Sequence, residues 1–185
     1  MAKILVAEYH PVPALSIPRP VETVHDFHAQ ADVVRRRRYG VIDVRGGRLH
    51  RIVLRPLPKL ISWPDLTLFG AWQHRHRAGD RCLLYYNQPR GSDSFLALKY
   101  VVSYRDATLA TFRGALQVLD AIARLKRTDA IVCDVANLRI SDRLAARWGW
   151  EPHCPSRWHR HFIKRFYGQY PDVPREIFTC SRHSP

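Results

Sequence analysis

The sequence lacks any apolar run long enough to cross a bilayer, which would take about 20 consecutive apolar residues. Its apolar start, Met1–Ala7, is too short for the central region of a secretory signal peptide. No internal repeat and no low-complexity tract interrupts the chain. These absences argue against a membrane protein and a secreted one, and we expect a cytoplasmic protein.

Cysteine is scarce and widely spread. The chain of 185 residues has four, and no two form a Cys-x-x-Cys pair: Cys82, Cys133, Cys154 and Cys180. In a chain of this size without a secretory signal, such spacing favours free thiols over a disulfide framework. Cys133 lies within an apolar run, so we expect it to be a small core residue.

Four potential metal ligands lie within nine residues: His153, Cys154, His159 and His161. Zinc sites use these residue types, but at more regular spacings and usually with a second pair of ligands. His74 and His76 would supply that pair only if the fold happened to bring them there. The sequence therefore predicts no metal site, and we expect these histidines to be exposed or half-buried.

Acidic residues are also few: 16 Asp and Glu stand against 30 Lys and Arg, for a formal net charge of +14. This surplus, carried mostly by arginine, predicts an anionic partner: nucleic acid, an acidic surface or a polyanionic cofactor such as coenzyme A. High arginine content can also reflect genomic composition alone, so nucleic acid is the less favoured partner. The run Arg35–Arg38 has two interpretations, as the last turn of a helix or as a nucleic-acid contact.

The chain does contain enough material for one hydrophobic core, because 46% of its residues are hydrophobic and 25% are charged. Its length fits a single domain spanning 1–185. We divide this domain into an N-terminal part of helices and hairpins (1–94), a core (95–167) and a tail (168–185).

Apolar periodicity predicts helices and antiparallel strands in the N-terminal part. The predicted helices are Val21–Arg38 and Asp65–His76. The predicted strands are Lys3–Tyr9, Val41–Val44, Leu49–Leu54 and Cys82–Tyr86. Gly46-Gly47 separates the second and third of these strands, which is typical of a β-hairpin.

The most informative stretch is Phe95–Trp150. Two apolar runs rich in β-branched and aromatic residues, Phe95–Tyr104 and Ala130–Val135, flank a segment of helical periodicity. The apolar stripe of that segment is Leu109, Phe112, Leu116, Leu119, Ile122 and Ala123. Strand, helix and strand in this order predict a parallel β-α-β unit. A shorter helix, a short strand at Glu151–Cys154 and a late strand at His159–Tyr167 are expected to follow.

The junction between the first strand of this unit and its helix is where we expect any chemistry. Asp106 is a candidate N-cap, with Ala107, Thr108 and Leu109 opening the helix. The first N–H groups of a helix lack internal partners and carry the positive end of its dipole, so they can hold a phosphate. Arg105 would add a fork of donors for a pyrophosphate. The alternative is that Asp106 only caps the helix and Arg105 is solvated.

The segment Tyr104–Ala110 resembles the acetyl-CoA pyrophosphate loop of the GNAT-type N-acetyltransferases, whose pattern is Arg/Gln-x-x-Gly-x-Gly/Ala. Arg105 and Ala110 match this pattern, and Thr108 stands in place of the first glycine. Asn137, and then Gly149-Trp150, resemble the family's later Asn…Gly-Phe segment. The resemblance extends from about Phe95 to Phe166.

The resemblance implies an α/β (α+β) fold with a GNAT-like mixed central sheet. The N-terminal part of that sheet would be antiparallel, the C-terminal part would be a β-α-β-α-β unit, and helices would cover both faces. It also implies acetyl-CoA, or another acyl-CoA, as cofactor, bound where two neighbouring parallel strands diverge. The implied cofactor-binding residues are Val101, Val102, Ser103, Arg105, Ala107, Thr108, Leu109, Ala110 and Asn137.

The resemblance further implies transfer of an acetyl or acyl group to an amine, on a small molecule or a peptide. Candidates for proton transfer, chosen by residue type alone, are Tyr104, Ser103 and His153. Relatives often have a tyrosine as general acid where this chain has Ala145. Thr108 and Ala145 favour the alternative: a catalytically inactive GNAT-like module that binds nucleic acid or a protein partner through its basic surface.

Overall fold

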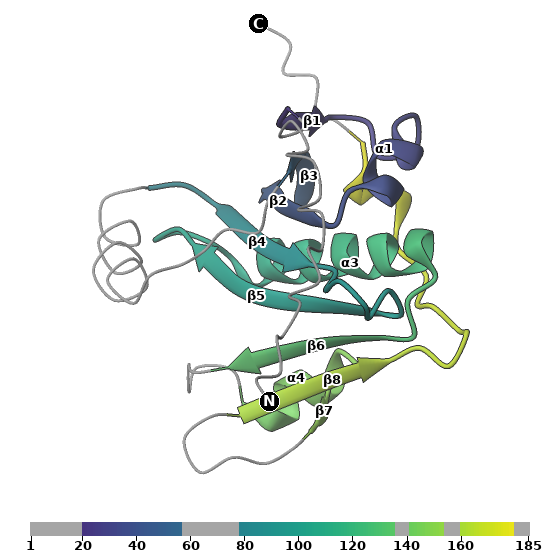
Figure 1. Cartoon of the computed structure of the whole chain (residues 1–185). Helices are drawn as coiled ribbons and strands as arrows, with labels where there is room; N and C mark the ends of the chain where they lie inside the picture. Colours follow the sequence, from purple (N-terminus) through teal and green to yellow (C-terminus); the bar gives the residue numbers. More distant parts are fainter. Residues whose placement is uncertain (1–19, 57–77, 136–140, 154–159, 180–185) are drawn as a thin grey trace, which may run out of the picture.

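A computed structural model describes residues 20–56, 78–135, 141–153 and 160–179. Eight strands in this part of the chain form one mixed sheet, in the order β1-β3-β2-β4-β5-β6-β8-β7 (Figure 1). Their bounds are Glu22–Val24 (β1), Tyr39–Arg45 (β2), Arg48–Arg55 (β3), Arg81–Asn87 (β4), Phe95–Ser103 (β5), Ala130–Val135 (β6), Glu151–Pro152 (β7) and Arg160–Arg165 (β8). The predicted strand Lys3–Tyr9 and the predicted helix Asp65–His76 lie outside the described residues.

One pair of neighbouring strands in this sheet is parallel, and the others are antiparallel. β2 and β3 form the predicted hairpin, and β4 pairs with β5 as predicted. β5 and β6 are parallel and are joined by the long helix α3, which confirms the predicted β-α-β unit. β8 then inserts between β6 and the short edge strand β7. The result is a mixed α/β architecture with an antiparallel N-terminal part.

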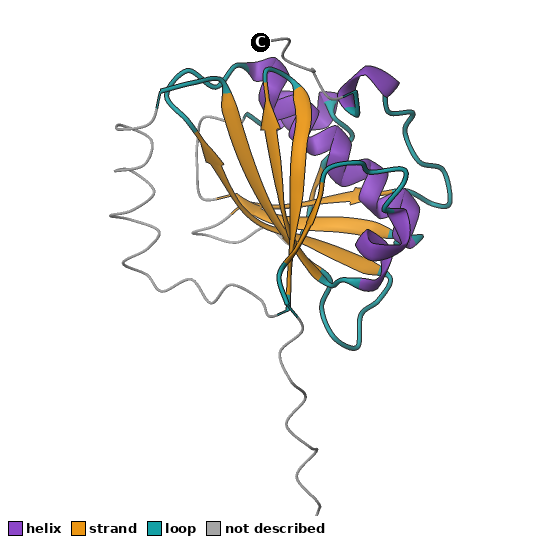
Figure 2. Ribbon diagram, turned by 90° about the horizontal axis from the view of Figure 1, so that it is seen from above, coloured by secondary structure: helices purple, strands orange, loops and turns teal. Residues whose placement is uncertain are grey.

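The described helices lie on one face of this sheet (Figure 2). They are α1 (Ala31–Arg36), α3 (Leu109–Lys126) and α4 (Asp142–Arg147), with a short 3-10 turn η2 at Arg175–Ile177. The two crossovers through α3 and α4 advance across the sheet in the same direction, so right-handed connections place both helices on the same side. Within the described ranges, the prediction of helices on both faces is therefore confirmed for one face only.

α3 supplies the central layer of the core. Leu116, Leu119 and Ile122 are buried against Ile42, Leu84 and Leu96 of the sheet, as members of one hydrophobic cluster. The predicted apolar stripe is thus correct in its middle and at its end. Its first member is an exception, because the Leu109 side chain is 60% exposed at the start of the helix. The helix ends at Arg127, whose backbone is left-handed (φ 56°).

The predicted helix Val21–Arg38 is wrong over its first half. Residues Glu22–Val24 form β1 on the edge of β3, and only Ala31–Arg36 is helical. Between them, the Asp26 side chain accepts hydrogen bonds from the N–H groups of His28 and Ala29, each at 2.9 Å. Such a turn ends the strand β1 at this point. The hydrogen bonds of β1 with β3 outweigh the preference for a helix that the spacing of the apolar residues indicates.

The four-arginine run Arg35–Arg38 does not behave as a single unit. Arg35 and Arg36 lie in the last turn of α1, as predicted from the helix dipole. Arg37 has left the helix and is buried, with its guanidinium donating to the Pro20 carbonyl and paired with Glu22. Arg37 therefore stabilises the start of the sheet rather than presenting a charge to solvent.

The two described cysteines are free thiols, as predicted. Cys82 is buried under α3 and Cys133 is half-buried on β6. Burial raises the pKa of each thiol to about 12. Both therefore stay protonated at neutral pH, and neither is a nucleophile.

No helix in the described part of the chain is both long and apolar enough to span a membrane.

Gly114 allows α3 to approach the β2–β3 turn closely. A Cβ atom at Gly114 would lie 2.7 Å from the carbonyl oxygen of Gly47, which is backbone and cannot rotate away. One turn earlier, the Gly47 N–H donates to Oγ1 of Thr111 at 2.8 Å.

We expect Gly114→Ala to lower the free energy of unfolding by about 1–3 kcal/mol, despite the better helix propensity of alanine. Urea denaturation measures this change; exposed Arg124→Ala should stay within about 0.5 kcal/mol of the parent. A stabilised Gly114→Ala would contradict this packing.

Candidate active site

β5 and β6 pair only at their first residues. The ladder begins at Phe95 and Ala130 and ends at Leu98 and Cys133, although β5 continues to Ser103. On its other side, β5 stays paired with β4 to the end, from Asn87↔Ala97 to Cys82↔Ser103. The last part of β5 thus leaves β6 and follows β4, so the two parallel strands diverge toward their carboxyl ends.

A β-bulge at Lys99 accounts for the divergence. In the β4–β5 ladder, Tyr85 pairs with Tyr100 and Tyr86 pairs with Leu98, so Lys99 is the extra residue. A bulge bends its strand and increases the local twist. It lies directly after Leu98, where pairing with β6 stops. The opening between β5 and β6 therefore begins at the bulge and faces the start of α3.

The predicted cofactor-binding residues fall on the two sides of this junction. Val101, Val102 and Ser103 are the last residues of β5, and all three are half-buried. Arg105, Thr108, Leu109 and Ala110 follow on the surface, with Ala107 partly buried among them. The fold therefore brings this predicted set together. Asn137 lies outside the described residues.

The prediction that Asp106 caps the helix is wrong. Thr108 is the N-cap of α3, and its Oγ1 accepts a hydrogen bond from the N–H of Thr111 at 3.2 Å. Oδ2 of Asp106 instead accepts from the N–H of Gly79 at 2.8 Å, which ties the loop to the start of β4. Threonine is also a favoured cap residue, although it ranks below aspartate, so the local sequence favoured Asp106 and the tertiary bond to Gly79 decided for Thr108.

The start of α3 also has a carboxylate next to it that sequence analysis did not anticipate. Oδ1 of Asp80 accepts from the backbone N–H of Thr108 at 2.8 Å, and the Thr108 hydroxyl lies 3.2 Å from both carboxylate oxygens. Burial raises the pKa of Asp80, but hydrogen bonds from Thr111 and Thr108 outweigh it and hold the pKa below its usual value. Asp80 is therefore charged at neutral pH. It lies outside the Phe95–Trp150 segment, so only the fold could place it here.

Two N–H groups of the first turn of α3 are still available. No described residue accepts a hydrogen bond from the N–H of Leu109 or Ala110, whereas the N–H of Thr111 is used by Thr108. Both residues are exposed, and Arg105 is exposed just before them. This end of α3 thus presents two amide donors next to the Asp80 carboxylate, with an exposed arginine three residues before the N-cap.

Of the three candidates for proton transfer, the fold brings two together. Ser103 and Tyr104 are consecutive at the end of β5, and Tyr104 is buried. Arg81 donates from Nη1 to Oη of Tyr104 at 3.1 Å, and its guanidinium lies 5.1 Å from the centre of the tyrosine ring. His153 follows β7, three strands away from β5, so it lies more than about 14 Å across the sheet, because β5 and β6 diverge at this end. Its backbone N–H donates to the carbonyl of His161.

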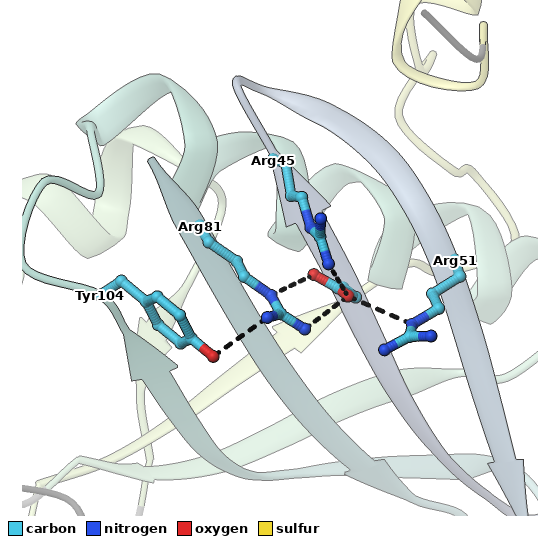
Figure 3. A network of polar contacts seen from close by, with 5 residues as sticks. Arg45, Arg51, Arg81 and Tyr104 are labelled. Atoms are coloured by element: carbon cyan, nitrogen blue, oxygen red, sulfur yellow. Dashed lines mark hydrogen bonds and ion pairs between the residues drawn. The ribbon is translucent and has the colours of Figure 1, made fainter. Parts of the chain in front are cut away.

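Tyr104 is connected to a buried carboxylate that the sequence did not reveal as special. Asp43 of β2 accepts two hydrogen bonds from Arg81, at 2.7 and 2.8 Å, and lies within 3.4 Å of Arg45 and 3.3 Å of Arg51 (Figure 3). Its side chain is only 2% exposed. Asp43 alternates with the core residues Ile42 and Val44, so it points to the face opposite α3. The only signal in the sequence is a single acid inside an apolar strand.

This Asp43 cluster holds Arg81 rigidly against Tyr104. Both oxygens of Asp43 are engaged by Arg81, so the carboxylate is not placed to accept a proton from a substrate. Three arginines around one carboxylate leave a local surplus of positive charge beside the end of β5. Chemically, the cluster positions a tyrosine hydroxyl and attracts anions.

No three His, Cys, Asp or Glu side chains gather into a possible metal site in the described ranges. His161 lies 4.0 Å from Asp134, and His153 bonds to its neighbour through the backbone. Cys154, His159, His74 and His76 lie outside those ranges.

The chain was compared with known proteins at three levels. No protein-family model, no curated protein and no solved structure matches it.

Proposed function

We propose that this protein is an acyl-CoA-dependent N-acyltransferase, which moves an acetyl or another acyl group to the amine of a small molecule or peptide. The observation that carries the proposal is the divergence of β5 from β6 directly in front of the first turn of α3. Ligands of open α/β sheets bind outside the carboxyl ends of the strands, and the divergence leaves this end of β5 free of β6. The resemblance of Tyr104–Ala110 to a GNAT loop supplies the identity of the ligand.

The proposed cofactor contacts follow from this arrangement. The edge of β5 at Val101–Ser103, beyond the ladder with β6, would pair with the amides of the pantetheine arm. The pyrophosphate would lie on the N–H groups of Leu109 and Ala110, with Arg105 as an additional donor. Asn137, by the same resemblance, would contact the arm. The acceptor amine would approach from the open end of the gap.

Transfer requires the amine to attack the thioester carbonyl, lose a proton and release coenzyme A as a thiol. Holding amine and thioester together supplies much of the acceleration, because it replaces a bimolecular encounter. Tyr104 is the side chain proposed to protonate the departing thiolate, because Arg81 donates to its Oη and holds the hydroxyl in place. Ser103, one residue earlier, is the other candidate at this position.

Acetyl-CoA titration tests the proposal by thermal shift. At a concentration 100-fold above the dissociation constant, binding should stabilise the fold by about 2.7 kcal/mol, or roughly 5–10 °C. Arg105→Ala should weaken binding about tenfold, because it removes a charge-assisted contact to phosphate. Arg90→Ala, in the exposed turn between β4 and β5, serves as the control and should bind as the parent does. Absence of any shift at millimolar acetyl-CoA would contradict the proposal.

A more specific test uses Asp80, whose negative charge opposes a phosphate at the same helix end. We expect Asp80→Asn to tighten acetyl-CoA binding by roughly two- to fivefold, because it removes a like charge without removing the hydrogen-bonding side chain. Isothermal titration calorimetry measures this change, with exposed Asp93→Asn as the control. If the pyrophosphate bound elsewhere, Asp80→Asn and Asp93→Asn would have the same affinity.

The second candidate function is a non-catalytic module that binds an anionic partner through its arginines. The specific observation in its favour is Asp80 itself, which already occupies part of the helix terminus that a pyrophosphate would need. Under this alternative, acetyl-CoA gives no thermal shift with either the parent chain or Asp80→Asn. Retention on DNA or RNA would not discriminate, because a net charge of +14 binds polyanions regardless of function.

A further inference from the structure

A cavity lies on the helical face of the sheet, apart from the place where β5 and β6 diverge. It has a volume of about 530 Å³ and lies between the middle of α3, the end of α4, β8 and the segment that follows β8. None of its lining residues belongs to β5 or to the first turn of α3. A ligand here would therefore not share contacts with an acyl-CoA bound at the start of α3.

The floor of this cavity is a buried ion pair. Nζ of Lys164 lies 2.7 Å from Oδ2 of Asp120, and the two side chains are 11% and 6% exposed. A Cβ atom at Gly149 would lie 3.3 Å from Cε of Lys164, so the glycine leaves room for the lysine stem. An ammonium group has three N–H donors, and Asp120 takes one of them. Lys164 thus brings unused hydrogen-bonding capacity to a cavity wall.

The charges around the cavity do not balance. Its four cations are Arg113, Arg147, Lys164 and Arg165, and its two carboxylates are Asp120 and Asp172. Lys164 is paired with Asp120, Arg165 with Glu151 at 2.6 Å, and Asp172 lies 3.9 Å from Arg124. Among the described residues, no acidic side chain pairs with Arg113 or Arg147. Two unpaired guanidinium groups, one on α3 and one on α4, therefore border the same cavity.

The uncharged walls are mostly aromatic and apolar, together with the amides of Gln117 and Gln169. Trp148, Phe166 and Tyr170 contribute rings, and Leu116 contributes an aliphatic side chain. Phe166 packs against Tyr170 with ring centres 4.8 Å apart, and Trp148 packs against Phe112 at 5.4 Å. These rings are held in place by their neighbours, so the cavity has fixed flat surfaces on which a planar ring can lie.

We propose that this cavity binds a small organic anion: a planar ring that carries one carboxylate or phosphate group. The ring lies against the half-buried Trp148 and Tyr170, and the anionic group is held by Lys164 and by the two guanidinium groups of Arg113 and Arg147. The volume of about 530 Å³ is within the range of ordinary small-molecule sites and leaves room for one or two fused rings.

Ligand-observed NMR and calorimetry with four probes test this inference. The probes are benzoate, phenyl phosphate, neutral benzyl alcohol and cationic benzamidine, each offered at up to 10 mM (on the order of weak-fragment affinities). We expect at least one of the two anions to bind, and their ratio tells a carboxylate site from a phosphate site. Benzyl alcohol should bind about tenfold more weakly or not at all, and benzamidine should not bind. Absence of binding by both anions, or an affinity for benzyl alcohol equal to that for the tighter-binding anion, overturns the proposal.

Two variants locate the site. Arg147→Ala should weaken binding of the anion about tenfold, whereas Arg143→Ala, on the same helix but outside the cavity lining, should leave it unchanged. The double variant Asp120→Leu with Lys164→Met replaces the floor by apolar side chains of similar size and should abolish binding while the chain stays folded. Equal affinities of Arg147→Ala and Arg143→Ala would overturn the assignment. Acetyl-CoA binding of Arg147→Ala should match that of the parent, so either proposal can fail without the other.

Discussion

Replacing Asp43 with alanine is expected to lower the free energy of unfolding by about 3–5 kcal/mol, a large fraction of the stability of an ordinary domain. The Asp43 carboxylate is 2% exposed and is the common partner of Arg81, Arg51 and Arg45. Removing it leaves three guanidinium groups facing one another on neighbouring strands. Arg81 is the most affected, because its side chain is only 20% exposed and both of its bonds to Asp43 are lost.

Urea denaturation of Asp43→Ala measures this loss, and a thermal scan should show a fall in Tm of roughly 10 °C. Asp93→Ala is the matched control. Asp93 lies 2.6 Å from Arg38, but its side chain is 69% exposed, so its removal should cost less than about 1 kcal/mol. Similar losses for the two variants would mean that Asp43 contributes no more than a surface ion pair.

Asp120→Ala is expected to be destabilising to a similar extent, by about 3–5 kcal/mol, because it leaves the buried ammonium of Lys164 without a counter-charge. Burial raises the pKa of Asp120, and the nearby Lys164 only partly offsets this effect. Burying this pair therefore costs desolvation free energy, and removing only one of its two charges costs more still. Its position between α3 and β8 means that the loss should affect the packing of the helix on the C-terminal half of the sheet.

The double variant Asp120→Leu with Lys164→Met separates the two contributions. It removes both charges and fills a similar volume, so its stability should return to within about 1–2 kcal/mol of the parent or exceed it. Asp142→Ala serves as the exposed control, since Asp142 lies 2.9 Å from Arg160 with its side chain 66% exposed. A double variant as unstable as Asp120→Ala alone would show that packing, rather than the unpaired charge, causes the loss.

Elements with strong periodicity and clear punctuation were predictable from the sequence. Gly46-Gly47 forms the turn between β2 and β3, and α3 has an apolar stripe over nearly its whole length. The alternation of strand, helix and strand was enough to predict the parallel pairing of β5 with β6. These features are local or follow from connection rules, so they need no knowledge of distant residues.

Predictions failed where a distant residue competed with a local preference. Val24 and Phe27 fit a helical stripe with Ala31 and Val34, yet Glu22–Val24 pairs with β3 because that edge is available in the folded sheet. Asp106 is a good helix cap by type, but the N–H of Gly79 engages it and Thr108 caps instead. Propensity is a weak preference, and a tertiary hydrogen bond can outweigh it.

The sequence alone determined the strand–helix–strand unit, the excess of positive charge and the set of residues at the junction of β5 with α3. Each of these three features follows from the composition, the periodicity or a contiguous motif of the sequence. Only the tertiary structure decided that Asp80 lies beside the first turn of that helix, that Asp43 is surrounded by three arginines, and that Lys164 pairs with Asp120 at the floor of a cavity. The physical reason is that a buried charge must find its partner across neighbouring strands and helices, and such partners lie far apart in the chain.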